Sequence, residues 1–128
     1  MTVVCVKWGE KYGAEYVNCL HWGASRWLLD VRHRFVCFTD DPTGISSQVE
    51  VKPLPQNDGW QGWWFKAYIF SQSAGLCGRI LYLDLDSVIV GSLSPLLRYK
   101  QGFALLSAAD FSAEEDVADG YNSSVMLW

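Results

Sequence analysis

Two aspartates stand one residue apart at the end of an apolar run, in the segment YLDLDSV at residues 82–88. In an extended segment residues i and i+2 point to the same side, so Tyr82, Asp84 and Asp86 would share one face and the intervening leucines the other. Two carboxylates this close repel each other, and one would take up a proton unless a cation lay between them. A hard divalent ion such as Mg²⁺ or Mn²⁺ removes this conflict and keeps coordination positions for substrate phosphates. The spacing therefore favours a metal ion that carries a diphosphate over two aspartates that merely cap a turn.

Alternating strand and helix patterns would position this pair. Short apolar or β-branched runs predict strands at residues 2–7, 34–39, 49–54, 79–85, 103–108 and 124–128. Helical spacing predicts helices at 14–25 and 63–73 and one turn at 93–97. In the second helix Trp63, Ala67 and Phe70 would share a face, with Lys66 on its border. This alternation indicates an α/β domain with a mostly parallel sheet, in which ligands bind at the carboxyl ends of strands. The acidic pair stands at such an end.

The composition indicates one folded domain covering residues 1–128. Half of the 128 residues are hydrophobic and 15% are aromatic, enough for a real core. The formal net charge is -4 and the basic residues are scattered, which argues against a nucleic-acid partner. No segment has the length of a membrane span, and the N-terminal apolar run is too short for a signal peptide, so we expect a cytoplasmic protein. The cysteines lack zinc or disulfide spacing, and we expect buried thiols at Cys5, Cys37 and Cys77.

Four stretches, in order along the chain, resemble nucleotide-sugar-dependent glycosyltransferases of the GT-A fold. The metal-binding strand of that fold, above all in family 8 (the glycogenin and lipopolysaccharide-galactosyltransferase group) and related bacterial enzymes, is similar to RILYLDLDSVIVGSLSPLL. The first strand of that fold with its base-binding loop is similar to VVCVKWGEKYGAEYV. The helix that carries a basic contact to the donor is similar to GWWFKAYIF. The (F/Y)NSG-type segment is similar to DGYNSSVMLW. The resemblance covers nearly the whole chain and implies a Rossmann-like α/β fold whose mixed, mostly parallel sheet is flanked by helices.

The resemblance also implies roles for single residues. Asp84 and Asp86 would bind Mn²⁺ or Mg²⁺ and, through it, the donor diphosphate. Lys66 matches a basic position that contacts the donor sugar or phosphates, and Asp110 falls where relatives carry an acidic residue beside the sugar. These four are the candidate catalytic residues. The candidate donor-binding residues are Lys7, Trp8 and Tyr12 in the base-binding loop, Lys66, Leu85 between the aspartates, and Asn122 and Ser123 at the sugar.

Ordinary structural roles stay open for several of these residues. Lys66 could be a solvated helix lysine, and Asn122 could serve a turn. Trp8 and Tyr12 could be core aromatics instead of stacking on a base. We expect the tryptophans at 60, 63 and 64 to pack in the interior, although a cluster near a sugar site could also stack on a pyranose face. No role in the site is expected for His21, His33 or the acidic run 114–116.

The chain departs from the family pattern after its last matching stretch. Relatives usually continue with acceptor-binding elements and a later histidine that serves as third metal ligand. The family's glycine is Ser124 here, and Lys7 and Trp8 stand where small or acidic residues are common. Donor binding is therefore better supported than transfer to a particular acceptor. Three interpretations stay open: a minimal enzyme, a shortened chain, or a homodimer that completes its site, the last favoured by the apolar VMLW segment.

The activity that the resemblance implies is metal-dependent hexosyl transfer from a nucleotide-diphosphate sugar, most simply a UDP-sugar. The acceptor would be a hydroxyl of a glycan, lipid or protein, or water when none is bound. The family-8 group retains the anomeric configuration, whereas an inverting enzyme would need Asp110 or Glu115 as base. A haloacid-dehalogenase-type phosphatase is the main alternative, with Asp84 phosphorylated and Asp86 as acid/base. That motif normally opens its domain, however, and only Lys100 follows here as a lysine. A non-catalytic nucleotide-sugar-binding module is the third possibility.

Overall fold

A computed structural model describes residues 1–56, 59, 61–108 and 120–128. Within them six strands form one sheet of order β3-β2-β1-β4-β6-β5. The strands are β1 (Thr2–Lys7), β2 (Arg34–Thr39), β3 (Glu50–Pro53), β4 (Ile80–Leu83), β5 (Ala104–Ser107) and β6 (Tyr121–Leu127). The helical segments are α1 (Ala14–Trp27), η1 (Gly62–Trp64), α2 (Phe65–Tyr68), η2 (Gln72–Ala74) and α3 (Ser94–Leu97), of which η1 and η2 are 3₁₀ turns.

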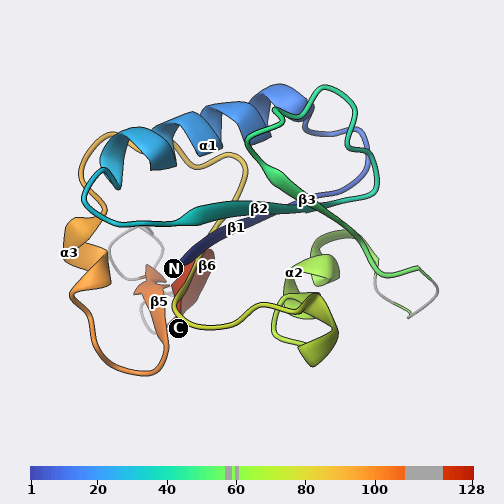
Figure 1. Cartoon of the computed structure of the whole chain (residues 1–128). Helices are drawn as coiled ribbons and strands as arrows, with labels where there is room; N and C mark the ends of the chain where they lie inside the picture. Colours follow the sequence, from blue (N-terminus) through green and yellow to red (C-terminus); the bar gives the residue numbers. More distant parts are fainter. Residues whose placement is uncertain (57–58, 60, 109–119) are drawn as a thin grey trace.

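Four of the strands are parallel and occupy one side of the sheet (Figure 1). β6 runs antiparallel between β4 and β5 and closes the other side. All six residues of β1 are buried, as expected for a central parallel strand whose β-branched side chains fit a sheet covered on both faces. The predicted mixed, mostly parallel α/β sheet is confirmed.

Two hydrophobic clusters cover the two faces of the sheet. On one face Val17, Leu20 and Ala24 of α1 pack against a cluster that includes the odd-numbered leucines of the segment 81–85 (Figure 1). On the other face Ile69, which follows α2, packs in a cluster with Tyr82. Successive residues of β4 therefore alternate between the two layers, as the period of a strand predicts.

The predicted helix over residues 63–73 is wrong as a single helix. Gly62 has φ +57°, a left-handed conformation that glycine adopts without strain, and a 3₁₀ turn starts there. Ser71 is extended, and its side chain accepts a hydrogen bond from the Ala74 backbone N–H, which starts a separate turn. Gly75 ends this turn in the left-handed conformation. The segment is therefore three short turns, which leaves Phe70 about half exposed.

Three other boundaries or environments differ from the prediction. β4 ends at Leu83, so the acidic pair lies just beyond the strand. β6 begins at Tyr121, three residues earlier than predicted. Cys5 and Cys37 are buried free thiols as predicted, but Cys77 is exposed, because it lies in the turn between η2 and β4 rather than in an element.

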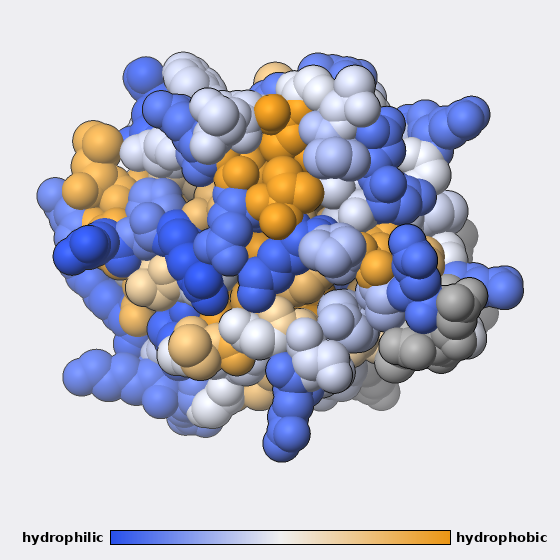
Figure 2. Space-filling view, turned by 45° about the vertical axis from the view of Figure 1, so that its right-hand side comes forward, coloured by the Kyte–Doolittle hydropathy of each residue, from blue (hydrophilic) through white to orange (hydrophobic). Residues whose placement is uncertain are grey.

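Apolar side chains reach the surface in separate patches, with hydrophilic side chains between them, on the face that Figure 2 displays. Within the described ranges no helix has the length and hydrophobicity that crossing a bilayer requires.

Candidate active site

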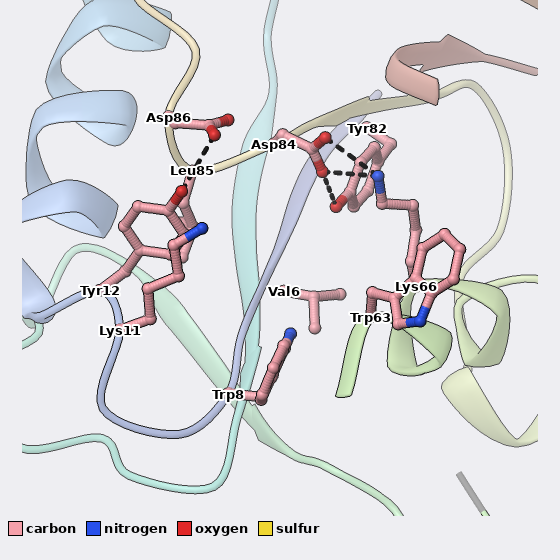
Figure 3. Close-up of a pocket in the computed structure, with 10 residues that line it drawn as sticks. All are labelled: Val6, Trp8, Lys11, Tyr12, Trp63, Lys66, Tyr82, Asp84, Leu85 and Asp86. Atoms are coloured by element: carbon pink, nitrogen blue, oxygen red, sulfur yellow. Dashed lines mark hydrogen bonds and ion pairs between the residues drawn. The ribbon is translucent and has the colours of Figure 1, made fainter. Parts of the chain in front are cut away.

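A cavity of about 270 Å³ opens at the carboxyl ends of β1 and β4. From β1 the chain continues to β2 and β3 on one side and returns to β4 on the other, so these two strands flank the point where the strand order reverses. Open α/β sheets bind ligands at this point, because the loops leave the sheet there in opposite directions. The cavity is lined by Val6, Trp8, Lys11, Tyr12, Trp63, Lys66, Tyr82, Asp84, Leu85 and Asp86 (Figure 3).

Asp84 is held by an ion pair and a phenol. The Lys66 ammonium lies 2.8 Å from its Oδ1 and 3.0 Å from its Oδ2. The hydroxyl of Tyr82 donates a hydrogen bond to Oδ1 at 2.5 Å. Burial raises the pKa of Tyr82 far above its ordinary value, and the charge of Asp84 raises it further. Tyr82 therefore stays protonated and remains a donor to this carboxylate.

Asp86 has different partners, on the opposite side of the cavity (Figure 3). Its Oδ2 accepts a hydrogen bond from the Tyr12 hydroxyl at 3.0 Å. The Lys11 ammonium lies 4.9 Å from the centre of the Tyr12 ring. Hydrogen bonding with Tyr12 raises the pKa of Lys11, and the charge of Asp86 acts in the same direction. The loop after β1 thus supplies a phenol to the second carboxylate and places a cation over the ring of that phenol.

An irregularity in β6 brings a serine to Lys66. The pairing with β5 shifts register between Leu105 and Leu106, whose partners are Met126 and Asn122. The residues between those partners bulge towards the end of β4, where the Ser124 carbonyl accepts a hydrogen bond from the Asp84 N–H at 2.8 Å. The Lys66 ammonium reaches Ser123 Oγ at 3.2 Å. Asn122 stabilises the bulge, because its Oδ1 accepts from the Ser124 N–H at 2.8 Å.

Aromatic rings form the wall below the acidic pair in Figure 3. The prediction that Trp63 and Trp64 pack in the interior is wrong, since their exposed fractions are 73% and 59%. Their rings lie 5.2 Å apart between centroids, and of the two only Trp63 lines the cavity. Trp8 is 40% exposed and also lines it. A Cβ on Gly62 would lie 3.6 Å from the Trp8 ring, which places this turn beside Trp8.

The structure brings most of the predicted site residues together. The cavity wall contains Trp8, Tyr12, Lys66, Asp84, Leu85 and Asp86, and Ser123 joins through Lys66. Lys7 is 4% exposed and does not line the cavity. Asn122 supports the β6 bulge and is not in the lining. The predicted roles of Asp110 and Glu115, and the packing of Trp60, lie outside the described residues.

Four lining residues were not predicted as site residues: Val6, Lys11, Trp63 and Tyr82. Tyr82 could have been found, because it shares the face of the acidic pair at spacing i, i+2. Lys11 stands one residue before Tyr12, in the loop that was predicted to hold the base. For Trp63 the sequence left stacking on a sugar open only as an alternative, because a continuous helix would have turned this side chain towards the core with Ala67.

The oxygen atoms of the acidic pair suit a hard divalent cation. Both carboxylates line the same cavity, and Mg²⁺ and Mn²⁺ prefer oxygen ligands, with one or two carboxylates sufficient when phosphates complete the coordination. Across the described residues no group of three or more His, Cys, Asp and Glu side chains is placed to hold a metal. The described residues therefore fit an ion that the protein and a phosphate ligand share, rather than one enclosed by protein.

The sheet order and the position of the site define the GT-A fold of glycosyltransferases. The galactosyltransferase LgtC, solved in complex with donor and acceptor sugar analogs, is similar with a TM-score of 0.66 and 19% identity, over 99% of this chain and 57% of LgtC. An active-site mutant of LgtC gives a TM-score of 0.68 at 19% identity, over 99% of this chain and 56% of the mutant. The glycosyltransferase GlyE of Streptococcus pneumoniae TIGR4 gives 0.59 at 17% identity, over 98% of this chain and 33% of GlyE.

No protein-family model matches the sequence, and no curated protein is significantly similar to it. At these levels of identity the solved structures establish the fold. The chain spans little more than half the length of LgtC and a third of GlyE.

Proposed function

We propose that the chain binds a nucleoside-diphosphate sugar, most simply a UDP-sugar, with Mn²⁺ or Mg²⁺, and transfers the hexosyl group to an acceptor hydroxyl. One observation carries this proposal: two carboxylates and the ammonium groups of Lys11 and Lys66 line one cavity at the reversal point of a GT-A sheet. A diphosphate bound with a divalent cation needs both signs of charge close together. The glycosyltransferase fold of the neighbouring structures supports the same reading.

In this proposal each wall of the cavity has a task. Asp84 and Asp86 hold the ion, which when bound neutralises charge on the leaving nucleoside diphosphate. Lys66 and Lys11 contact phosphate oxygens as point charges. Trp8 and Tyr12 offer ring faces to the base, and Trp63 offers a face to a second ring of the donor. Ser123 and Asn122 are proposed at the sugar.

Three further parts of the proposal rest on the resemblance alone. These are retention of the anomeric configuration, an acidic role for Asp110, and a base contact from the backbone around Lys7. The acceptor side has the least support, because the chain spans 57% of LgtC, the neighbour solved with donor and acceptor sugar analogs. A second candidate is a module that binds the nucleotide sugar without transferring it. The phosphatase alternative is disfavoured, since Asp84 follows the fourth strand along the chain.

Incubation with UDP-sugars and GDP-sugars, with and without Mn²⁺, tests the proposal when both binding and nucleotide release are measured. Metal-dependent release of UDP is expected for the transferase, which hydrolyses some donor when no acceptor is present. Binding without release would support the module. If no nucleotide sugar binds while a simple phosphate ester is hydrolysed, the transferase proposal is wrong.

Replacing Asp86 tests the site itself. We expect Asp86→Ala to weaken Mn²⁺-dependent nucleotide binding by roughly 10- to 100-fold or more. Loss of a residue that only supports a metal ligand already costs roughly 10- to 100-fold in affinity, and Asp86 is proposed as a ligand itself. Asp30→Ala is the matched control, since Asp30 is an exposed aspartate outside the cavity lining. Isothermal titration of UDP at fixed Mn²⁺ measures both variants. Equal affinities for Asp86→Ala and Asp30→Ala would mean that the acidic pair is not the metal site.

A further inference from the structure

Each carboxylate of the acidic pair already has its own partner among the side chains of the protein. Asp84 has the Lys66 ammonium at 2.8 Å and the Tyr82 hydroxyl, and Asp86 has the Tyr12 hydroxyl at 3.0 Å, with Lys11 on the same side. The sequence predicted a repulsion that only a metal ion would relieve. The structure relieves it differently, by giving each carboxylate its own partners on opposite sides of the cavity (Figure 3).

Lys66 is the better placed of the two lysines to compete with a metal ion. Its ammonium contacts both oxygens of Asp84, at 2.8 and 3.0 Å, and therefore uses the lone pairs that an ion would need. The pair is shielded from solvent, with side chains 23% and 24% exposed. Two further contacts stabilise the ammonium in this position: Ser123 Oγ lies 3.2 Å from Nζ, and the centre of the Tyr82 ring lies 5.1 Å from it. A divalent ion and this ammonium repel each other if both stay at Asp84.

Lys66 would also have an alternative partner once a diphosphate is bound. It sits in the one-turn helix α2 beside the cavity, on a flexible four-carbon side chain. A diphosphate in the cavity would offer its ammonium more negative charge than one carboxylate does. Moving from Asp84 to the phosphates would free the carboxylate in the same step.

We propose that Lys66 is an exchangeable counter-ion: it occupies Asp84 in the free protein and transfers to the diphosphate when nucleotide and divalent ion bind, which couples the two binding events. This inference rests on the proposed function and deepens it. Because such coupling is reciprocal, the nucleotide tightens metal binding by the same factor as the metal tightens nucleotide binding. We expect the metal alone to bind weakly, since it must displace an ammonium for which Asp84 is the one ion-pair partner among the described residues.

The exchange has a signature that a simple phosphate contact lacks. Removing the ammonium should strengthen binding of the metal alone, because Asp84 is then free, and weaken binding of nucleotide in the presence of metal. A lysine that only touches phosphate would leave binding of the metal alone unchanged. If the lysine had only a structural role, its removal would weaken the binding of both ligands.

The experiment measures Mn²⁺ binding to the full chain from the electron paramagnetic resonance signal of free Mn²⁺, with and without UDP. In Lys66→Met we expect Mn²⁺ alone to bind about tenfold tighter than in the unmodified protein, and UDP to lose most of its tightening effect, within the usual range of coupling between two sites. Lys100→Met is the matched control, because Lys100 is exposed and outside the cavity lining. It removes the same charge and should leave the coupling intact.

Two results would overturn the inference: Mn²⁺ alone binding Lys66→Met no tighter than the unmodified protein, or Lys100→Met giving the same tightening. Circular dichroism monitors folding, and Lys66→Gln, which also removes the charge, replaces Lys66→Met if that variant does not fold. The proposed function fails separately. If UDP does not bind the unmodified protein with Mn²⁺ but Lys66→Met still binds Mn²⁺ more tightly, Lys66 competes with the metal at Asp84 and the proposed nucleotide ligand is wrong.

Discussion

Tyr82 connects the core to the chemistry of the site in a single side chain. Its ring is 2% exposed and packs in the hydrophobic cluster on the α2 face, while its hydroxyl donates to Asp84. The alternation of β4 makes this possible, because the residue two positions before Asp84 leaves the sheet on the same side. The carboxylate is therefore oriented by a buried and rigid partner before any ligand arrives.

We expect Tyr82→Phe to lower the free energy of unfolding by roughly 1–3 kcal/mol, the cost of losing a hydrogen bond to a charged group while the ring packing is kept. Urea denaturation followed by circular dichroism measures the change. Tyr68→Phe is the control, since the Tyr68 ring packs on Phe38 and its hydroxyl forms no hydrogen bond within the described part of the chain. Equal losses in the two variants would contradict a special contribution from the Asp84 contact.

The acidic pair could be recognised from the sequence because its evidence is local: type, spacing and a preceding apolar run. The side chains that contact the pair could not be predicted from the sequence. Lys66 and Tyr12 are 18 and 74 positions away from the aspartates they contact, and only the folded chain specifies those pairs. The prediction of a crowded, unshielded pair therefore missed the ammonium and the phenol that the protein itself supplies.

At the scale of elements, the segment from η1 to η2 decides which aromatic rings reach the site. Helical periodicity predicted one helix that buries Trp63, but Gly62 starts a 3₁₀ turn that leads into α2, and Ser71 starts a separate turn after it. Local backbone preferences overrode the periodicity there, because a left-handed glycine and a serine cap each start a new turn. Trp63 consequently lines the cavity instead of the core.

We expect Trp63→Ala to weaken Mn²⁺-dependent binding of a UDP-sugar by about tenfold, since stacking on an aromatic ring contributes roughly 1–3 kcal/mol per base in nucleic-acid complexes. Trp64→Ala is the matched control, because Trp64 is also exposed but does not line the cavity. Isothermal titration compares both variants with the unmodified protein. Unchanged affinity in Trp63→Ala, or equal weakening in both variants, would contradict a stacking role.

The β6 bulge is the second element-scale feature that the sequence did not reveal. Residues 124–128 were predicted as a strand and Asn122 as a possible turn residue, whereas β6 already begins at Tyr121. Its pairing with β4 and β5 is non-local, and a register shift leaves no signal in hydrophobic alternation. The contact between the Lys66 ammonium and Ser123 Oγ, at 3.2 Å, was likewise not predicted, although both residues were predicted to bind the donor.

At the scale of the whole molecule, the parallel strands were predictable from the sequence, and their order in the sheet determines where the cavity lies. β1 and β2 have the predicted bounds, because continuous β-branched and apolar runs specify buried parallel strands. Placing β4 beside β1 then sets the cavity between their carboxyl ends. Which side of β4 the C-terminal strand would join depends on contacts between distant residues, so the antiparallel half could not be ordered from the sequence.

Ligand binding should therefore stabilise the whole sheet, because the cavity joins β1, β4, α2 and the loop before α1. We expect UDP with Mn²⁺, at 100 times its dissociation constant, to raise the free energy of unfolding by about 2.7 kcal/mol. For a chain of 128 residues this corresponds to a rise in Tm on the order of 10 °C. Differential scanning calorimetry measures it.

Removal of the metal by EDTA should abolish most of this rise in Tm, because the lysine contacts that remain bind the diphosphate only weakly without the ion. Asp30→Ala should keep the full rise in Tm and Asp86→Ala should lose it, since of these two residues only Asp86 lines the cavity. A rise that persists in EDTA would mean that the nucleotide binds independently of the acidic pair. In that case the cavity at the reversal point would still be a nucleotide site, but Asp84 and Asp86 would not hold the metal on which the proposed transfer depends.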